Sequence, residues 1–408
     1  MVEPTQTDRS RPAHPLAGRT ARLAAAALAV LVVVAGAGWL TVLNRPDPAV
    51  AVWRGPPAAG GPPATATPLA VGADTVTLSA TGDIILGNAP GSLPPNGGRG
   101  FFAAVKGALA ADFVMGNLEE PLTDDTGYDK CRPAPAPPAS PTPEEPDTNN
   151  CHQFRAPPGY AAHLRDAGFD LLNQANNHGY DYGAAGYRNT QRALEQYGLL
   201  HTGAPDQITV ATVKGIRIAV LGFSSYPWSN PLLDVARAKA VVARAAARAD
   251  LVVVQVHMGA EGAGATHVRP GSEIFLGEDR GDPVRFSRAV VDAGADLVVG
   301  HGPHVLRGME FYRGRLVAYS LGNFCGGGGT LNSSGNLGIS GVLKVSLRKD
   351  GGWAGGSLIS TTHQGGGGLP RMDPGHRGAA LVRSLSTADF RATAARLTGT
   401  GQITPPGR

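Results

Sequence analysis

The chain has 408 residues, which is enough for one large domain or two ordinary ones, and only 6% of its residues are aromatic. Its formal net charge is +4. Five arginines and two acidic residues give residues 1–45 a charge of +3, which leaves +1 for the rest of the chain. A body so close to neutral lacks the basic face that a nucleic-acid partner requires, so nucleic-acid binding is excluded as a function.

Residues 23–43 form an apolar stretch without a charged side chain. As a helix this stretch would span roughly 30 Å, the thickness of the hydrocarbon core of a bilayer. Four arginines precede it, at positions 9, 11, 19 and 22, and only Arg45 follows closely. This bias predicts a single-pass signal-anchor in the cell membrane, with residues 1–22 in the cytoplasm and the body extracytoplasmic. A cleaved signal peptide, which would leave a secreted body, is the alternative.

Residues 44–73 are rich in Pro, Ala and Gly, which predicts an extended linker. We expect a domain over residues 74–365, with a Pro-rich insertion at 124–156 and a C-terminal extension over 366–408. Cys131 and Cys151 flank the Pro-rich run. Because export permits disulfides, we expect these two cysteines to be paired, with two free thiols as the alternative. The third cysteine, Cys325, is assigned no role.

Strand-like and helix-like segments alternate along the first part of the body. The segments typical of strands are 75–87, 113–122, 169–178, 216–225, 251–259 and 296–304. The segments typical of helices are 101–113, 157–168, 184–198, 234–249 and 283–295. Continuous apolar strands between helices indicate strands that are buried on both faces, and this pattern predicts an α/β core.

The later part of the body has a different pattern. Residues 309–324 predict a β-hairpin that turns at Arg313 and Gly314. Residues 338–349 and 355–364 predict further antiparallel strands, so the fold class is expected to be mixed α/β and α+β. The end of the chain is expected to be poor in strands, with one helix over 387–397.

The predicted strands of the α/β core end in groups that bind metals. These groups are Asp83; Asn117 and Glu119; Asn176, Asn177 and His178; His257 and Glu261; and His301 and His304. Each alone is more often a helix cap, a turn residue or a core histidine than a ligand. The carboxyl ends of such strands meet at one edge, however, and this mixture of donors suits one or two divalent ions such as Mn, Fe or Zn. The glycines in TGD, HMG and GHG leave room for close approach.

The segment Asn176-Asn177-His178 would have a chemical role next to such ions. Divalent ions hold a phosphate or polarise an amide carbonyl and activate water for attack. The leaving group then needs a proton, which a histidine can supply. We therefore expect Asn177 to be a neutral oxygen ligand and His178 to be the proton donor. The alternative is a simple turn, because asparagine tolerates the left-handed backbone conformation.

Five motifs carry a family resemblance. In chain order they are GDIILG, NLEEPL, NNHGYDYG, HMGAE and GHGPHVLRGMEFYRGRLVAYSLGNF. They resemble the motifs of the CapA-type bacterial capsule synthesis proteins, also called poly-γ-glutamate biosynthesis proteins, from about residue 75 to about residue 345. That family is similar to the calcineurin-like metallophosphoesterases. The resemblance implies a two-sheet β-sandwich flanked by helices, with a dinuclear metal site at its edge.

Carried over by motif, the resemblance implies a catalytic role for His178 and a metal site. The implied metal ligands are Asp83, Glu119, Asn177, His257, His301 and His304. The chain departs from the phosphoesterase pattern in three ways. Ile85 stands where a histidine ligand is usual, Asn-Leu-Glu replaces Gly-Asp in the second motif, and the final two histidines are separated by two residues instead of one.

The resemblance implies a membrane-anchored, extracytoplasmic protein of capsule or poly-γ-glutamate biosynthesis that performs metal-assisted hydrolysis or transfer. The alternatives are a non-catalytic accessory that binds or exports the anionic polymer, and a metal-dependent amidase or peptidase acting on a γ-glutamyl polymer. The expected partners are the cell membrane, the polymer or a phosphate or amide substrate, and other membrane proteins of capsule biosynthesis. The residues expected to bind substrate are Arg155, Arg307, Glu261 and Asn323. Arg188 and Arg269 also lie near the motifs; for each arginine a solvated surface charge is the alternative.

Overall fold

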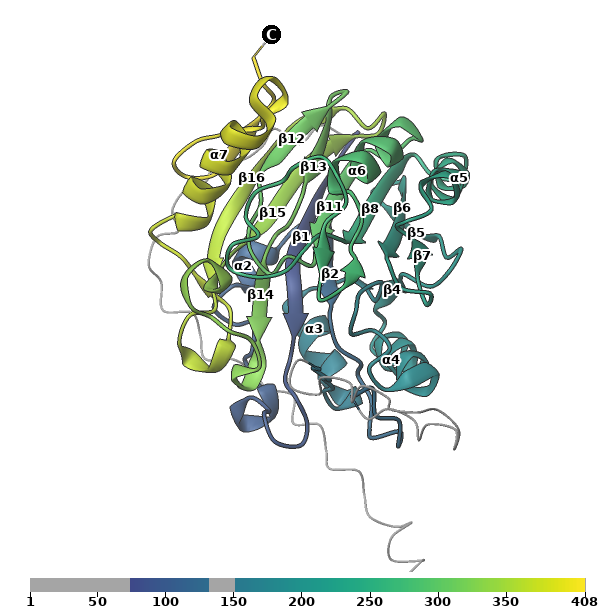
Figure 1. The fold of residues 1–408 in the computed structure, drawn as a ribbon, viewed down its shortest axis with the longest axis vertical. Helices are drawn as coiled ribbons and strands as arrows, with labels where there is room; N and C mark the ends of the chain where they lie inside the picture. Colours follow the sequence, from purple (N-terminus) through teal and green to yellow (C-terminus); the bar gives the residue numbers. More distant parts are fainter. Residues whose placement is uncertain (1–73, 132–150, 408) are drawn as a thin grey trace, which may run out of the picture. The chain divides into compact units, whose positions relative to one another are not determined.

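The computed structural model describes residues 74–131 and 151–407 (Figure 1). The predicted anchor at 23–43, the linker at 44–73 and the middle of the Pro-rich insertion lie outside these residues. Within the described ranges, none of the helices combines the length and the apolarity that crossing a bilayer needs. The predicted disulfide between Cys131 and Cys151 is confirmed. Cys325 is a buried free thiol.

The larger of two main sheets has ten strands in the described part of the chain. Eight of them follow one another in the order β18 (Arg396–Leu397), β19 (Gln402–Thr404), β16 (Trp353–Thr362), β15 (Ile339–Arg348), β1 (Thr75–Ile85), β2 (Phe113–Leu118), β3 (Leu171–Asn173) and β4 (Leu200–Thr202). Two more strands pair from the side, β14 (Asn323–Gly326) with β1 and β17 (Arg371–Met372) with β16. From β1 to β4 the neighbouring strands are parallel.

The second sheet has seven strands in the described residues. Their order is β12 (Met309–Tyr312), β13 (Arg315–Ala318), β11 (Leu297–His301), β8 (Leu251–His257), β6 (Ile216–Ser224) and β5 (Thr209–Val213), with β7 (Asn230–Pro231) beside β6. A separate small hairpin pairs β9 (Ile274–Phe275) with β10 (Glu278–Asp279). The central strands β6, β8 and β11 are parallel. β8 and β11 are buried along their whole length, as the apolar runs predicted.

The two sheets pack against each other through one buried apolar cluster. It combines side chains such as Leu78 and Met115 of the first sheet with Val220, Val253 and Val299 of the second. Helices cover the outer faces, because two further clusters join each sheet to its own helices. The mixed α/β class is therefore confirmed, with two sheets in the middle and helices outside (Figure 1).

The covering helices are α3 (Ala161–Ala167), α4 (Gly183–Gln196), α5 (Val235–Ala246), α6 (Pro283–Asp292) and α7 (Arg377–Phe390). Leu164 of α3 and Leu194 of α4 pack on the first sheet, and Val241 of α5 and Phe286 of α6 pack on the second. Val382 of α7 joins the cluster between the sheets. The helices α3 to α6 each match a predicted helix to within a few residues.

The start of two helices follows from the local sequence. The carboxylate of Asp234 accepts a hydrogen bond from the backbone N–H of Arg237 at 3.0 Å, and Asp282 accepts one from Arg285 at 2.9 Å. An N-terminal cap of this kind satisfies a backbone donor that the first turn leaves free. α3 ends at Gly168, which takes a left-handed conformation (φ 98°) that suits glycine.

Two predicted helices are wrong in extent. Residues 101–113 form only the four-residue helix α2 (Lys106–Leu109), because Phe101 and Phe102 turn into the apolar cluster under the first sheet before it begins. The helix predicted over 387–397 is the end of α7, which stops at Phe390 since Arg391 leaves helical geometry (φ 46°). The last residues of that prediction belong to β18.

The predicted turn at Arg313 and Gly314 is confirmed. Both residues have positive φ, 48° and 78°, as a two-residue hairpin turn requires. The predicted hairpin over 309–324 nevertheless ends with β13, because the chain then crosses to the first sheet, where β14 pairs parallel with β1. The end of the chain is also richer in strands than predicted, since β17, β18 and β19 all join the first sheet.

Close approach of two backbones at the end of β1 requires a glycine at position 82. A Cβ atom there would lie 1.8 Å from the carbonyl oxygen of Gly322. The next residue, Asp83, donates its backbone N–H to the same oxygen at 2.9 Å and lies opposite Asn117 and Asn323 in the two neighbouring strands. The glycine of the TGD motif therefore lets three strands meet where Asp83 points toward the candidate site.

We expect Gly82→Ala to lower the free energy of unfolding by about 3 kcal/mol, because no side-chain rotation relieves a clash with backbone. Gly107→Ala is the matched control, since nothing lies within 4 Å of a Cβ at that position in α2. It should be neutral or stabilising by about 1 kcal/mol at most. Urea unfolding measures both variants, and equal effects would contradict the role given to Gly82.

Candidate metal centre

Strands from both sheets deliver the candidate site at their carboxyl ends. Asp83 lies near the end of β1, and Glu119 directly follows β2. His257 and His301 are the last residues of β8 and β11 and lie opposite each other in the sheet. His304 follows β11 in a loop and has a left-handed backbone (φ 62°), a strained conformation for a residue other than glycine.

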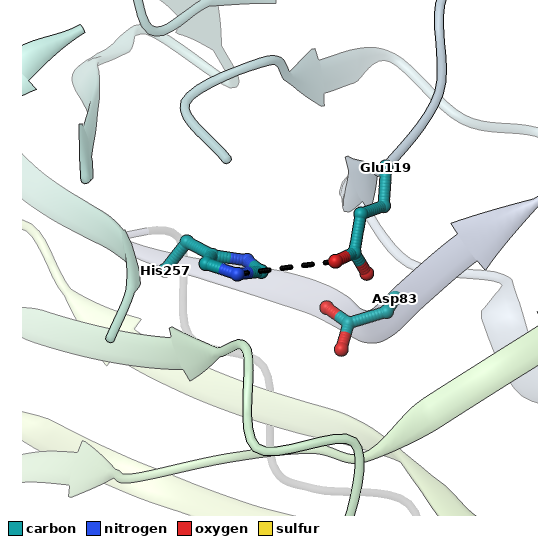
Figure 2. A group of neighbouring side chains, drawn as sticks. All are labelled: Asp83, Glu119 and His257. Carbon is teal, nitrogen blue, oxygen red and sulfur yellow. Dashed lines mark ion pairs between the residues drawn. The ribbon is translucent and has the colours of Figure 1, made fainter. Parts of the chain in front are cut away.

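Three of these side chains turn toward one another, as Figure 2 shows for Asp83, Glu119 and His257. One ligand atom of each lies within 4.8 Å of the other two. Glu119 Oε1 is 3.8 Å from His257 Nε2, and His301 Nδ1 is 3.7 Å from Asp83 Oδ1. These separations are too wide for hydrogen bonds. They suit two donor atoms that bind the same divalent cation, because a nitrogen or oxygen ligand lies about 2.0–2.2 Å from an ion such as zinc.

Most of these ligand atoms have no hydrogen-bond partner. Seven buried atoms of four residues are in this state: both carboxylate oxygens of Glu119, both ring nitrogens of His257 and of His301, and Oδ1 of Asn177. The side chains of Glu119, His257 and His301 are at most 1% exposed. A buried polar atom without a partner costs about 1–3 kcal/mol, so a concentration of them needs a reason. A divalent cation would satisfy this donor set.

Burial also sets the charge states of the ligands. It raises the pKa of Glu119 well above its usual value, and the nearby Asp83 carboxylate adds to the effect. Burial lowers the pKa of His257 well below its usual value and that of His301 to about 4. The two histidines are therefore neutral near pH 7, which is the form that binds a metal.

His304 stands among three carboxylates. Its Nδ1 is 3.1 Å from Asp83 Oδ2, and its Nε2 is 3.3 Å from Glu261 Oε2 and 3.9 Å from Glu119 Oε1. Burial alone would lower the pKa of His304, but the carboxylates of Glu119 and Glu261 outweigh it and raise the pKa well above the usual value. Burial would raise the pKa of Glu261, yet the positive charges of His304 and Arg280 lower it to about 2. Positive charge is thus held where the acidic groups converge.

Arg280 is a residue of the site that the sequence reasoning missed. It is 4% exposed, and its Nη1 lies 3.0 Å from Glu261 Oε1. Its Nε donates to Glu278 at 3.0 Å, and its guanidinium lies over the ring of Tyr226. No strand-end pattern marks Arg280, because it follows the small β9–β10 hairpin, which was not predicted.

A chain of amides orients Asp83. Asn117 donates from Nδ2 to Asp83 Oδ1 at 2.9 Å. The Oδ1 of Asn117 in turn accepts from Asn173 at 2.9 Å and from Asn176 at 3.1 Å. The side chain of Asn176 is thereby committed to this chain, which leaves Asn177 as the asparagine whose oxygen is free for a ligand role.

His178 is paired with a buried carboxylate three residues later. Its Nδ1 lies 2.7 Å from Oδ2 of Asp181, which is fully buried. This contact fixes the proton on Nδ1 and leaves Nε2 as the nitrogen for exchange with a substrate. Burial lowers the pKa of His178, opposed by Asp181, and Glu261 lies within electrostatic reach of its ring. The His-x-x-Asp spacing in the sequence is the signal that would have identified Asp181.

Comparison with known families bears on the same residues. A family model described as bacterial capsule synthesis protein PGA_cap matches residues 77–327. This chain belongs to that family. The matched span contains every residue of the PGA_cap site described above, and it ends one residue after β14.

Named relatives agree with the PGA_cap assignment. The chain is similar to the capsule biosynthesis protein CapA of Bacillus anthracis, with 31% identity over 62% of this chain and 60% of the relative. It is 30% identical to the PGA biosynthesis protein CapA of Bacillus subtilis, over 62% of this chain and 63% of the relative. A shorter match, 30% over 36% of this chain and 43% of the relative, is to a probable polyglutamine synthesis accessory protein of Mycobacterium tuberculosis. The chain thus spans less than two thirds of the length of the relatives it matches.

One residue expected to bind substrate is committed elsewhere in this PGA_cap protein. Arg307 is 1% exposed, and its two terminal nitrogens contact Glu273 at 2.9 and 2.8 Å. It also donates to the carbonyl oxygens of Ala260 and Ala265. The guanidinium therefore holds the loop after β8 in place, and substrate binding by Arg307 stays a prediction.

The other residues expected to bind substrate fall into two groups. Glu261 is part of the site, and Asn323 lies beside Asp83 with a buried Oδ1 that has no partner. Arg155 lies over the ring of Tyr182 at 5.5 Å, and its Nη1 is 3.5 Å from the carbonyl oxygen of Thr123. Two arginines near the motifs, Arg188 and Arg269, are exposed.

Proposed function

We propose that this PGA_cap protein is a membrane-anchored, extracytoplasmic, metallophosphoesterase-like hydrolase or transferase of capsule or poly-γ-glutamate biosynthesis. The observation that carries the proposal is the set of seven buried ligand atoms without hydrogen-bond partners in Glu119, Asn177, His257 and His301. Structural stability gains nothing from such a set in the absence of a cation, because each atom has given up its hydration without compensation.

The donors present fit a borderline divalent cation such as Mn, Fe or Zn. Asp83, Glu119 and His257 would hold a first ion, since their ligand atoms already converge. His301 and Asn177 are further donors for a second ion, joined by His304 once the cation displaces its proton. When bound, such an ion polarises a phosphoryl or carbonyl oxygen and activates water.

The chain's own residues supply the rest of the chemistry. His178 donates a hydrogen bond from Nδ1 to Oδ2 of Asp181, so its Nε2 is the position from which a proton passes to a leaving group. Arg280 holds Glu261, which in turn contacts His304 and the amide of Asn177 at 3.3 and 3.5 Å. This network links the loop after β8 to the loop after β3 and holds the two loops in place beside the site.

A non-catalytic accessory role is the second candidate. Ile85 stands where the phosphoesterase pattern has a histidine, and it is buried in the apolar interior. The mycobacterial relative carries the word accessory in its name. An accessory protein would bind the anionic polymer and use the metal, if at all, for structure. A metal-dependent amidase acting on γ-glutamyl bonds would use the same ligands on a different substrate.

A product assay with the purified full-length chain separates these functions. The metal-loaded and the chelator-treated protein are each given an aryl phosphate ester and a γ-glutamyl anilide. Metal-dependent release from the ester is the expected result. Release from the anilide alone would identify an amidase. No release from either substrate by protein that demonstrably holds metal would leave the accessory role and reject the hydrolase.

The proposed topology has its own test. External protease applied to whole cells should remove the body and leave a short N-terminal stub in the membrane, because residues 1–22 are proposed to be cytoplasmic. Immunoblotting with tags at each end of the chain distinguishes the two fragments. Full protection of the body in intact cells, with digestion after lysis, would contradict an extracytoplasmic body.

A further inference from the structure

The disulfide joins two short segments that both contact Asp181, the hydrogen-bond partner of His178. These segments, residues 128–131 and 151–154, are called the clamp below. From the first, Lys130 Nζ contacts Asp181 Oδ1 at 2.7 Å. From the second, the backbone N–H of Phe154 donates to Asp181 Oδ2 at 2.8 Å, and Gln153 Nε2 donates to the carbonyl oxygen of Asp181 at 2.7 Å.

The clamp also reaches the NNH segment itself. Lys130 Nζ donates a second hydrogen bond to the backbone carbonyl of Asn177 at 3.2 Å. The ring of Phe154 packs on the ring of His178, with 4.7 Å between their centroids. Gln153 donates back to the carbonyl of Tyr128 at 3.3 Å, so the two segments also hold each other. Contacts from both segments of the clamp therefore reach the backbone of Asn177, the carboxylate of Asp181 and the imidazole of His178, which is the proposed proton donor.

We propose that the clamp is a positioning device for His178, and that the Cys131–Cys151 disulfide makes this positioning dependent on oxidation. The inference rests on the proposed function, because it assumes that the orientation of His178 matters for turnover. It makes Lys130 and Phe154 positioning residues for the reaction. The clamp touches one proposed metal ligand, Asn177, through its backbone carbonyl. Asp83, Glu119 and His257 lie on or next to other strands, so opening the disulfide should leave the ion proposed between these three in place.

The clamp restricts the motion of Asp181 and, through it, of the His178 ring. Asp181 is buried and its carboxylate accepts from His178, Lys130 and Phe154, so the carboxylate keeps one orientation. Two of these three partners belong to the clamp. The disulfide spans a sequence separation of 20 residues. Without it the two segments regain the chain entropy of an open loop, and each contact then has to form on its own.

The test uses the full-length chain labelled with ¹⁵N-histidine. A hydrogen-bonded Nδ1 proton of a buried imidazole exchanges slowly with water and gives a resolved downfield signal. The His178 signal is assigned by its absence in His178→Gln. Three perturbations are compared: chemical reduction, the double variant Cys131→Ser/Cys151→Ser, and Lys130→Met. The matched control is Lys214→Met, which breaks a comparable lysine–aspartate contact of 2.7 Å to Asp112, away from the site.

We expect all three perturbations to broaden or remove the His178 signal while at least the ion held by Asp83, Glu119 and His257 is retained, and Lys214→Met to leave the signal sharp. Turnover of a substrate with a poor leaving group should fall roughly tenfold, a part of the roughly hundredfold that a placed general acid supplies. A sharp signal after reduction, or lost turnover with an unchanged signal, would overturn the proposal, as would unchanged turnover beside a lost signal. If no form turns over any substrate, the proposed function fails and the His178 signal alone decides whether the clamp positions the ring.

Discussion

His178→Ala is expected to slow hydrolysis of a substrate with a poor leaving group by roughly a hundredfold or more, the usual contribution of a general acid. A substrate whose leaving group needs no proton should be affected less. Metal content should stay close to that of the wild type, because the Nδ1 of His178 faces Asp181 and the seven unpartnered ligand atoms belong to other residues. Steady-state rates on the two substrates, with metal analysis of the same preparation, measure this.

Asn177→Ala is the companion variant and should behave in the opposite way. It removes a buried oxygen that has no hydrogen-bond partner, so it should lower metal content with only a small change in melting temperature. If the segment were only a turn, both variants would melt earlier and both would keep their metal. That pattern would reject the roles given to Asn177 and His178 together.

Glu119→Gln is the second change with a large expected effect. Changes that act only indirectly on a metal ligand already weaken binding about 10- to 100-fold, so loss of this carboxylate should weaken it by at least roughly a hundredfold. The metal-free variant should nevertheless melt a few degrees higher than the metal-free wild type, because an amide is less costly to bury without partners than a carboxylate. Opposite effects on metal binding and on metal-free stability are the signature of a ligand. Titration calorimetry and thermal melts with and without chelator give the two quantities.

The neighbouring residue provides the matched control. Glu120 is as deeply buried as Glu119, but its Oε1 accepts from the backbone N–H of Leu86, away from the cluster of ligands. Glu120→Gln should therefore leave metal affinity unchanged. Equal loss of affinity in the two variants would mean that general disturbance of the loop after β2, and not loss of a ligand, explains the effect.

The comparison of these two glutamates shows what a sequence can predict. The end of β2 was recognisable from its apolar run, so a carboxylate at the edge of the sheet was predictable. The strand-end pattern and the family motif both pointed to Glu119 and not to Glu120, and the two side chains have different contacts in the structure. His257 and His301 were predictable for the same reason, because each ends a strong apolar strand, and Asp83 lies two residues before the end of β1.

Other features depend on tertiary structure that no local pattern encodes. Arg280 reaches Glu261 only because the segment after β8 folds back over the site through a short hairpin. Arg307 was expected to bind substrate because it lies near a motif, but its buried contact with Glu273 depends on that same loop. The helix predicted over 101–113 is regular only over Lys106–Leu109, because Phe101 and Phe102 enter the apolar cluster from turns that precede it. The cysteine pair was predictable from the expected export and from the Pro-rich run that the two residues flank, whereas the contacts of Lys130, Gln153 and Phe154 with Asp181 were not.

The most direct test of the account is the metal content of the purified full-length chain, measured by mass spectrometry of the elements after exposure to Mn, Fe and Zn in turn and removal of free ions. The account predicts one or two tightly held divalent ions per chain, lost in Glu119→Gln and retained in Glu120→Gln. A chain that binds none of these metals, or that binds them equally well in both variants, would contradict the claim that the buried carboxylates and histidines at the strand ends form a metal centre.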